Sequence, residues 1–133
     1  VLMKNENVRT ALDLTQEWNE ATDGNSQLTM GCIVVRREFA EENKAAVDAF
    51  LEEYSASVTY VKENVEDASK LVEQFNLTGD AQIAAAAIPQ CNLTWITGEE
   101  MQSTIGGYYE VLYAAEPSSI GGNLPDDSFY YIP

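Results

Sequence analysis

The sequence predicts a mostly helical fold with two or three short strands. Long segments place apolar residues at helical spacing, and only short runs of β-branched residues lie between them. The 133 residues fit one ordinary domain. Few strands among several helices do not complete a doubly wound sheet, so we expect the remaining strands to come from chain outside this sequence.

The first part of the chain is expected to contain two short strands. Residues 8–14 alternate loosely and favour a short strand, and residues 15–21 favour a helical turn anchored by Trp18. The turn cluster at 23–26 then leads into residues 28–37, LTMGCIVVRR, which are β-branched and apolar. This second run predicts a strand that is buried on at least one side. A third, weaker extended segment is expected at residues 91–96.

The predicted helices follow from periodicity and capping signals. Residues 40–63 carry one apolar stripe, formed by Val47, Phe50, Leu51, Tyr54, Val58 and Val61. Asn64 and Asp80 are expected to cap the next two helices.

The last predicted helix opens at Thr97, which has capping-box spacing to Glu100, and runs through Leu112. Gly106 and Gly107 should weaken it by up to about 1 kcal/mol each relative to alanine. The tail ends in three aromatic residues at 129–131, which we expect to dock onto a folded body.

Composition excludes several functions. Seven basic against 22 acidic residues give a net charge of −15, so binding to nucleic acid or to an anionic membrane is not expected. The sequence contains no histidine, which removes the commonest general base and metal ligand. We therefore predict no catalytic residues, no metal site, no cofactor and no enzyme activity. Cys32 and Cys91 are either buried free thiols or one disulfide, and spacing leaves that choice open.

Four stretches resemble one family over nearly the whole chain. They are VRTALDLTQEW (8–18), MGCIVVRREFAEENKAAVDAFLEEY (30–54), AIPQCNLTWITGEEM (87–101) and SIGGNLPDDSFYY (119–131). They resemble the C-terminal half of solute-binding proteins of ABC importers, in the class serving nitrate, sulfonate, taurine and thiamine-pyrimidine uptake. The beginning, Val1-Leu2-Met3, has no signal-peptide pattern and reads as a start inside a larger protein.

The resemblance implies an α/β fold of the periplasmic-binding-protein type II, with two lobes and the ligand between them. Residues 1–27 would end one lobe, residues 28–37 would form a crossover strand between lobes, and residues 38–133 would complete the helical part of the other lobe. The N-terminal half of the protein would be missing here, and the apolar surface that it leaves uncovered would favour self-association of the fragment.

The same resemblance implies a function in transport. The protein would capture a small-molecule solute outside the cell and deliver it to an ABC permease, as a lipoprotein of a Gram-positive bacterium or in a periplasm. Met30, Gly31, Asn92 and Trp95 are the residues expected to face the ligand, and the family pattern favours a disulfide between Cys32 and Cys91. The alternatives are an extracellular sensing domain and a pyrimidine-synthesis-like enzyme, although that related enzyme uses a histidine of its own chain.

Overall fold

The computed structural model describes residues 6–133, and in this range the chain forms helices but no β-strand. The predicted α/β fold of the periplasmic-binding-protein type, with its two or three strands, is therefore wrong. The expected interruption at Val1-Leu2-Met3 lies outside the described residues.

Within residues 6–133, the predicted strands are extended segments that belong to no β-sheet. Residues 8–13 and 28–36 have no regular secondary structure, and neither do residues 92–97. A strand is stable only when a neighbour satisfies its backbone N–H and C=O groups, and β-branched composition alone does not provide that neighbour. Met30 and Val34 are 87% and 81% exposed, so the expected burial of residues 28–37 is also wrong.

The chain divides into two compact units, which we describe separately. Unit 1 comprises residues 35–95. Its helices are α2 (Arg37–Glu42), α3 (Lys44–Glu63), α4 (Val65–Gln74), α5 (Ala81–Ala87) and the short 3-10 helix η2 (Ile88–Gln90). Unit 2 comprises the described residues up to 34 together with residues 96–133. Its helices are α1 (Leu14–Ala21), α6 (Gly98–Ala115) and the 3-10 helices η3 (Pro117–Ile120) and η4 (Asp127–Phe129). We predicted a different division, in which residues 1–27 end one lobe of a larger protein, residues 28–37 cross between lobes and residues 38–133 belong to the other lobe. That division stays a prediction.

Two asparagines divide the helices of unit 1. The long predicted helix is broken at Asn43, whose Nδ2 donates to the Phe39 carbonyl at 3.1 Å. Asn64 separates α3 from α4 in the same way, since its Nδ2 donates to the Tyr60 carbonyl at 3.1 Å. Neither side chain caps the helix that follows it. Asn64 was predicted as an N-cap; instead its amide satisfies the end of the preceding helix.

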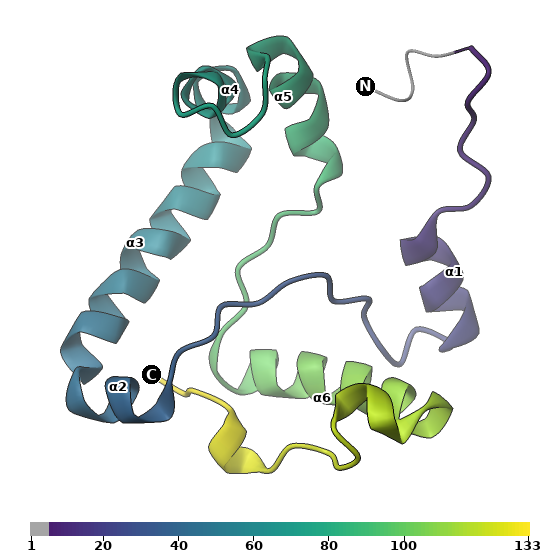
Figure 1. Ribbon diagram of the computed structural model, residues 1–133, viewed down its shortest axis with the longest axis vertical. Helices are drawn as coiled ribbons and strands as arrows, with labels where there is room; N and C mark the ends of the chain where they lie inside the picture. Colours follow the sequence, from purple (N-terminus) through teal and green to yellow (C-terminus); the bar gives the residue numbers. More distant parts are fainter. Residues whose placement is uncertain (1–5) are drawn as a thin grey trace. The chain divides into compact units, whose positions relative to one another are not determined.

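Small side chains bring the helices of unit 1 together. The buried apolar residues of the described chain are Ala40, Val47, Ala68 and Ala84, and all four belong to this unit. Figure 1 shows α4 and α5 side by side after the end of α3. Asp80 caps α5 as predicted, accepting hydrogen bonds from the backbone N–H of Gln82 and Ile83.

Unit 2 is organised around α6 and an aromatic row. α6 runs unbroken through Gly106 and Gly107. The C-terminal tail lies against it, since the Tyr109 and Phe129 rings are 6.1 Å apart and Gln102 Nε2 donates to Asp127 Oδ1 at 2.9 Å. The predicted docking of the terminal aromatics is confirmed for Phe129.

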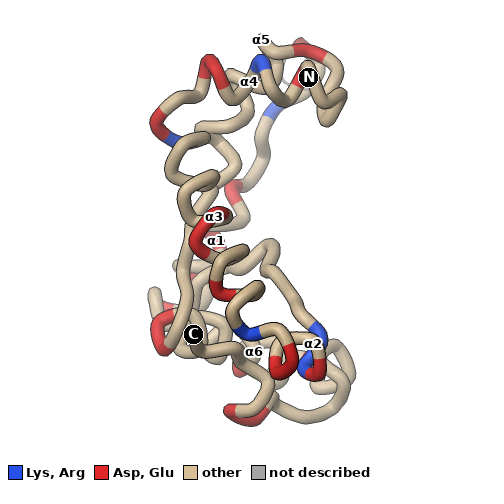
Figure 2. The backbone as a smooth tube through the Cα atoms, turned by 90° about the vertical axis from the view of Figure 1, so that its left-hand side faces the viewer, with Lys and Arg blue, Asp and Glu red and all other residues tan. Residues whose placement is uncertain are grey.

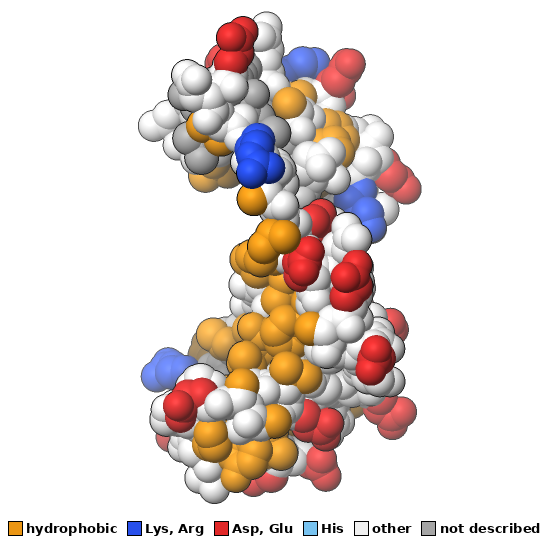
Figure 3. All heavy atoms as spheres, turned by 90° about the vertical axis from the view of Figure 1, so that its right-hand side faces the viewer, with side chains coloured by type: hydrophobic (Ala, Val, Ile, Leu, Met, Phe, Trp, Pro, Cys, Tyr) orange, Lys and Arg blue, Asp and Glu red, His pale blue; other side chains and the backbone are white. Residues whose placement is uncertain are grey.

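The surface is acidic and carries many apolar groups. Figure 2 shows red acidic segments outnumbering blue basic ones along the chain. Figure 3 shows hydrophobic side chains open to solvent, and Leu14, Met30 and Phe75 are each more than 60% exposed. Within residues 6–133, no helix combines the length and the apolar character that a membrane crossing requires.

Candidate functional site

A tight loop follows α1 and builds one wall of the candidate site. Asp23 and Gly24 adopt left-handed backbone conformations, with φ of 51° and 72°. The Thr22 hydroxyl donates to the Trp18 carbonyl at 2.9 Å and lies 3.4 Å from the Ser26 carbonyl. These bonds fold residues 22–26 back onto the end of the helix, so the loop holds a defined shape.

Trp18 fixes this loop to the rest of unit 2. Its indole Nε1 donates to the Ser26 hydroxyl oxygen at 3.2 Å, and Ser26 is only 5% exposed. On α6, the Tyr108 ring packs against the indole with the centroids 5.1 Å apart. The half-buried Trp18 therefore connects α1, the loop and α6 through one polar and one aromatic contact.

Gly107 is the glycine of α6 that faces the loop. A Cβ atom on Gly107 would lie 3.5 Å from the Asn25 carbonyl oxygen, which is an ordinary van der Waals distance, whereas a Cβ atom on Gly106 would meet nothing within 4 Å. The backbone of the loop therefore packs against α6 at Gly107.

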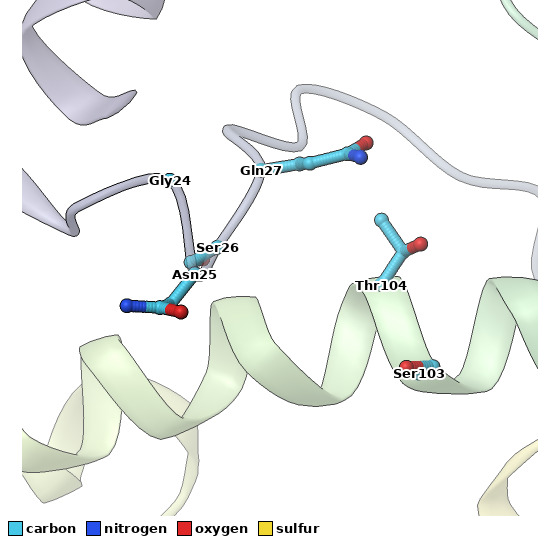
Figure 4. Close-up of a pocket in the computed structure, with 6 residues that line it drawn as sticks. All are labelled: Gly24, Asn25, Ser26, Gln27, Ser103 and Thr104. Atoms are coloured by element: carbon cyan, nitrogen blue, oxygen red, sulfur yellow. The ribbon is translucent and has the colours of Figure 1, made fainter. Parts of the chain in front are cut away.

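A polar pocket of about 160 Å³ lies between the loop and α6. It is lined by Gly24, Asn25, Ser26, Gln27, Ser103 and Thr104. Figure 4 shows the Gln27 side chain reaching over α6 while the Thr104 side chain rises from the helix toward the same space. Every lining residue is uncharged, so the pocket offers amide and hydroxyl groups for hydrogen bonding.

An apolar groove of about 320 Å³ lies on the α1 side of the same tryptophan. Its lining residues are Leu14, Glu17, Trp18, Ala21, Leu28 and Met30. Ser26 belongs to the pocket and Trp18 to the groove, and the two are joined by the hydrogen bond described above. The Trp18–Ser26 hydrogen bond thus links a residue of the groove to a residue of the pocket.

Two phenols beside this region have raised pKa values. Burial raises the pKa of Tyr109 above its ordinary value, and the neighbouring Cys32 adds to the shift. Burial also raises the pKa of Tyr130, with a further contribution from Tyr109. Both phenols are therefore neutral near pH 7. The part of the chain that the structure describes contains no group of three or more potential metal-ligating side chains.

The predicted ligand-facing residues fall in both units. Met30 lines the groove, and Gly31 follows it in the same open segment, with no atom near a would-be Cβ. Asn92, with a φ of 49°, and Trp95, whose ring is 5.4 Å from that of Tyr54, belong to unit 1. Ligand contact by these four residues stays a prediction.

The two cysteines also belong to different units. Cys32 and Cys91 are free thiols in the structure, and both are exposed. The Cys91 thiol lies 3.3 Å from the Ala87 carbonyl oxygen. The disulfide between them, which was implied by the resemblance, stays a prediction.

Sequence reasoning missed the polar residues of the pocket. Gln27, Ser103 and Thr104 carry no motif, and their residue types are common on surfaces. The available signals were the turn cluster at 23–26 and the glycine pair at 106–107, which together indicate a loop packed closely on a helix. The pair was interpreted only as a weak point of that helix.

A family model described as "Menaquinone biosynthesis" matches residues 2–113. No curated protein and no solved structure matches the chain.

This match overturns the transport hypothesis. The resemblance to solute-binding proteins of ABC importers was wrong, and with it the expected solute capture and the permease partner. The prediction that the chain is no enzyme is also contradicted, since biosynthesis is carried out by enzymes. The enzyme alternative was closer than the main hypothesis. The absence of histidine does not exclude an enzyme, because carboxylates, phenols and lysines also transfer protons.

The matched range begins at the second residue and includes α1, the loop, the whole of unit 1 and most of α6. It covers the polar pocket and the apolar groove completely. Because it spans far more than half of the 133 residues, the chain belongs to the menaquinone biosynthesis family.

Proposed function

We propose that this chain acts in an enzyme that synthesises menaquinone. The observation that carries the proposal is the family match over residues 2–113. Menaquinone is built from small ring compounds, so the enzyme needs a site for a compact organic substrate. The two hollows beside Trp18 supply such a site within one unit of the chain.

The polar pocket provides groups that can assist a reaction at a carbonyl. The hydroxyls of Ser103 and Thr104 and the amide of Gln27 are hydrogen-bond donors. Donors fixed around an oxygen stabilise the negative charge that develops on it in a transition state, and loss of one such donor typically slows a reaction by about 100-fold or more. These three side chains are our candidates for that role.

The groove provides a candidate proton acceptor. Glu17 is the carboxylate among its lining residues, and it lies one residue before Trp18 on α1. A carboxylate within reach of a substrate C–H or O–H group acts as a general base without any histidine. The proposal therefore assigns proton transfer to Glu17 and oxygen binding to the pocket hydroxyls.

The proposal is tested by disrupting the gene in its host and measuring menaquinone by liquid chromatography and mass spectrometry. We expect menaquinone to fall strongly and a ring-containing precursor to accumulate, and the accumulated compound identifies the substrate. The intact gene restores menaquinone, and added menaquinone restores respiratory growth. Unchanged menaquinone in a verified disruption strain would refute the proposal.

Complementation with variants assigns the activity to the site. A gene carrying S103A and T104A should restore much less menaquinone than the intact gene. The matched control carries S57A and T59A, which remove the same two hydroxyls from the exposed side of α3 in unit 1. Equal restoration by both variants would place the activity elsewhere. Fractionation of the same cells tests the expected location outside the cytoplasmic membrane, which stays a prediction.

A further inference from the structure

The chain after α6 returns along that helix as a C-terminal tail. The family match ends at residue 113, whereas α6 ends at Ala115 and the tail continues to residue 133. Figure 1 shows the tail in yellow running back beside α6, and both segments belong to unit 2. The family match therefore assigns no role to the tail.

The tail extends a row of aromatic rings that begins at Trp18. The centroid of the Tyr108 ring lies 5.1 Å from that of Trp18 and 6.3 Å from that of Tyr109. Phe129 continues the row from the tail, 6.1 Å from Tyr109 and 5.3 Å from Tyr130. The edge-to-face contact between Tyr109 and Phe129 is therefore where the rings of the tail meet the rings of the helix.

The contacts between the tail and α6 lie at the surface. Phe129 is 56% exposed, and the 2.9 Å hydrogen bond from Gln102 to Asp127 is exposed to solvent. No residue from 121 to 133 is buried. Water competes for exposed hydrogen bonds, and segments with few buried apolar contacts can open locally while the rest of a protein stays folded. The end of the tail meets this condition.

A glycine stands where this exposed part begins. The N–H of Gly122 donates to the Pro117 carbonyl at 2.8 Å and so remains bound to η3. Gly122 has a φ of 88°, and a Cβ atom there would meet nothing within 4 Å, so the left-handed backbone and not a close contact accounts for the glycine. Beyond it, Asp126 caps η4 by accepting from the Ser128 N–H at 2.9 Å. Rotation at Gly122 can therefore move the end of the tail while both short helices keep these local bonds.

We propose that residues 123–133 form a strap on α6, which pivots at Gly122 between a docked and a released state while the helices of unit 2 stay folded. In the docked state Phe129 lies against Tyr109, and Gln102 donates its hydrogen bond to the strap. In the released state both contacts are lost, and the face of α6 that carries Tyr109 is open. The strap lies outside the matched residues, so this proposal does not depend on the proposed function.

The test is cleavage of the folded 133-residue chain by chymotrypsin, followed by intact-mass spectrometry. Chymotrypsin cuts after aromatic residues, and the strap offers Phe129, Tyr130 and Tyr131. When opening and closing are fast relative to cleavage, the rate of cutting follows the fraction of molecules that are open. We expect the chain to be cut first in the strap and much later within α6.

Gly122→Ala should raise the rate of cutting in the strap about tenfold. Alanine disfavours the left-handed φ of the docked state, and this strain is relieved when the strap is released. Gly106→Ala is the matched control, because its Cβ also meets open space but lies within α6. It should leave cutting in the strap unchanged.

A second pair of variants tests the contact with α6. Gln102→Ala removes the donor to Asp127 without changing the strap itself, and it should raise the rate of cutting in the strap several-fold. Gln16→Ala is its control, because it removes a glutamine–carboxylate hydrogen bond of the same 2.9 Å length that lies within α1. It should leave cutting in the strap unchanged.

Trp18 fluorescence in a Trp95→Phe background shows whether the helices stay folded, because the chain has two tryptophans. The emission should be the same with and without Gly122→Ala. A changed emission, or cutting within α6 as fast as in the strap, would show that the tail opens only together with the helices and would overturn the proposal. Equal cutting with glycine and with alanine at position 122 would also overturn it, since an end that frays without pivoting there does not respond to this substitution.

Discussion

The indole nitrogen of Trp18 donates a hydrogen bond to the hydroxyl oxygen of Ser26, and this contact joins the groove-lining helix to the pocket-lining loop. Ser26→Ala removes the acceptor and leaves a half-buried N–H group without a partner. We expect the free energy of unfolding to fall by about 1–3 kcal/mol. Urea unfolding followed by Trp18 fluorescence, in a Trp95→Phe background, measures it, because the chain has two tryptophans.

Ser69→Ala is the matched control. Ser69 is also buried, at 3% exposed, and its hydroxyl donates to the Glu66 carbonyl at 2.8 Å within α4. The Glu66 carbonyl can also accept the backbone hydrogen bond of the helix, so loss of the Ser69 hydroxyl leaves no hydrogen-bond donor without a partner. We expect Ser69→Ala to cost clearly less than Ser26→Ala. Equal losses would mean that the indole hydrogen bond contributes nothing specific.

The glycine pair of α6 predicts two opposite effects of one substitution. Gly106→Leu should stabilise the helix by about 0.5–1 kcal/mol, because leucine favours helices and nothing lies near its Cβ. Gly107→Leu places a branched side chain beyond a Cβ that already lies 3.5 Å from the Asn25 carbonyl oxygen. The longer side chain should displace the loop and lower the free energy of unfolding. Thermal unfolding measures both effects, and equal stabilisation by Gly107→Leu and Gly106→Leu would contradict the packing of the loop at Gly107.

Local signals in the sequence predicted the helices, because those signals act within a few residues. Asp80 caps α5 as expected, since an N-cap needs only its own carboxylate and the next backbone N–H groups. The helix break at Asn43 was not predicted, because an asparagine side chain can form a hydrogen bond with the preceding turn as easily as with the following one. The strand predicted for residues 28–37 was wrong because a strand depends on a neighbouring strand, which the local pattern does not specify.

The candidate site depends on residues that are distant in sequence. Gln27 and Thr104 come from opposite ends of the chain, and both are of ordinary surface type. Their meeting follows from the Trp18 contacts, which hold the loop of Ser26 beside α6. Trp18 was predicted as a helix anchor, and Met30 as a ligand-facing residue because of a family resemblance that proved wrong. No rule of spacing would have joined these residues to the pocket.

The N-cap of α1 predicts a loss of stability and a change in the surroundings of Trp18. The Asp13 carboxylate accepts from the backbone N–H groups of Thr15 and Gln16 at 2.9 and 3.2 Å. Asp13→Ala should cost about 1 kcal/mol and loosen the helix that carries Trp18. Asp80→Ala removes an equivalent cap from α5 in unit 1 and should cost as much without changing the Trp18 emission. Urea unfolding and fluorescence in the Trp95→Phe background measure both, and an unchanged Trp18 emission in Asp13→Ala would argue against the loosening of α1.

The expected disulfide gives a direct chemical prediction. If Cys32 and Cys91 are bridged in the purified oxidised protein, thiol titration in denaturant finds no free thiol, and reduction lowers the melting temperature. The loop-entropy contribution of such a bridge is roughly 4 kcal/mol. The Cys32→Ser, Cys91→Ser double variant should melt at a temperature that does not respond to reductant. Two free thiols in the unreduced protein would refute the bridge.

The tyrosines of unit 2 predict a loss of stability at alkaline pH. Burial raises the pKa values of Tyr109 and Tyr130 above those of the unfolded chain, so the folded state holds these protons to higher pH. Their contribution to stability is complete below about pH 10, the ordinary tyrosine value. It is lost as the pH rises through the raised values, because the unfolded state then binds fewer protons than the folded one.

Tyr109→Phe with Tyr130→Phe should flatten this dependence. We expect the double variant to match the unmodified protein near pH 7 and to lose less stability between pH 9 and pH 11, measured by urea unfolding with circular dichroism. Tyr60→Phe, on α3 in unit 1, controls for the removal of a phenol away from α6. Because the Tyr109 and Phe129 rings pack together, a phenylalanine at position 109 keeps this ring contact with the tail. An identical alkaline slope in the double variant would show that other groups govern the transition.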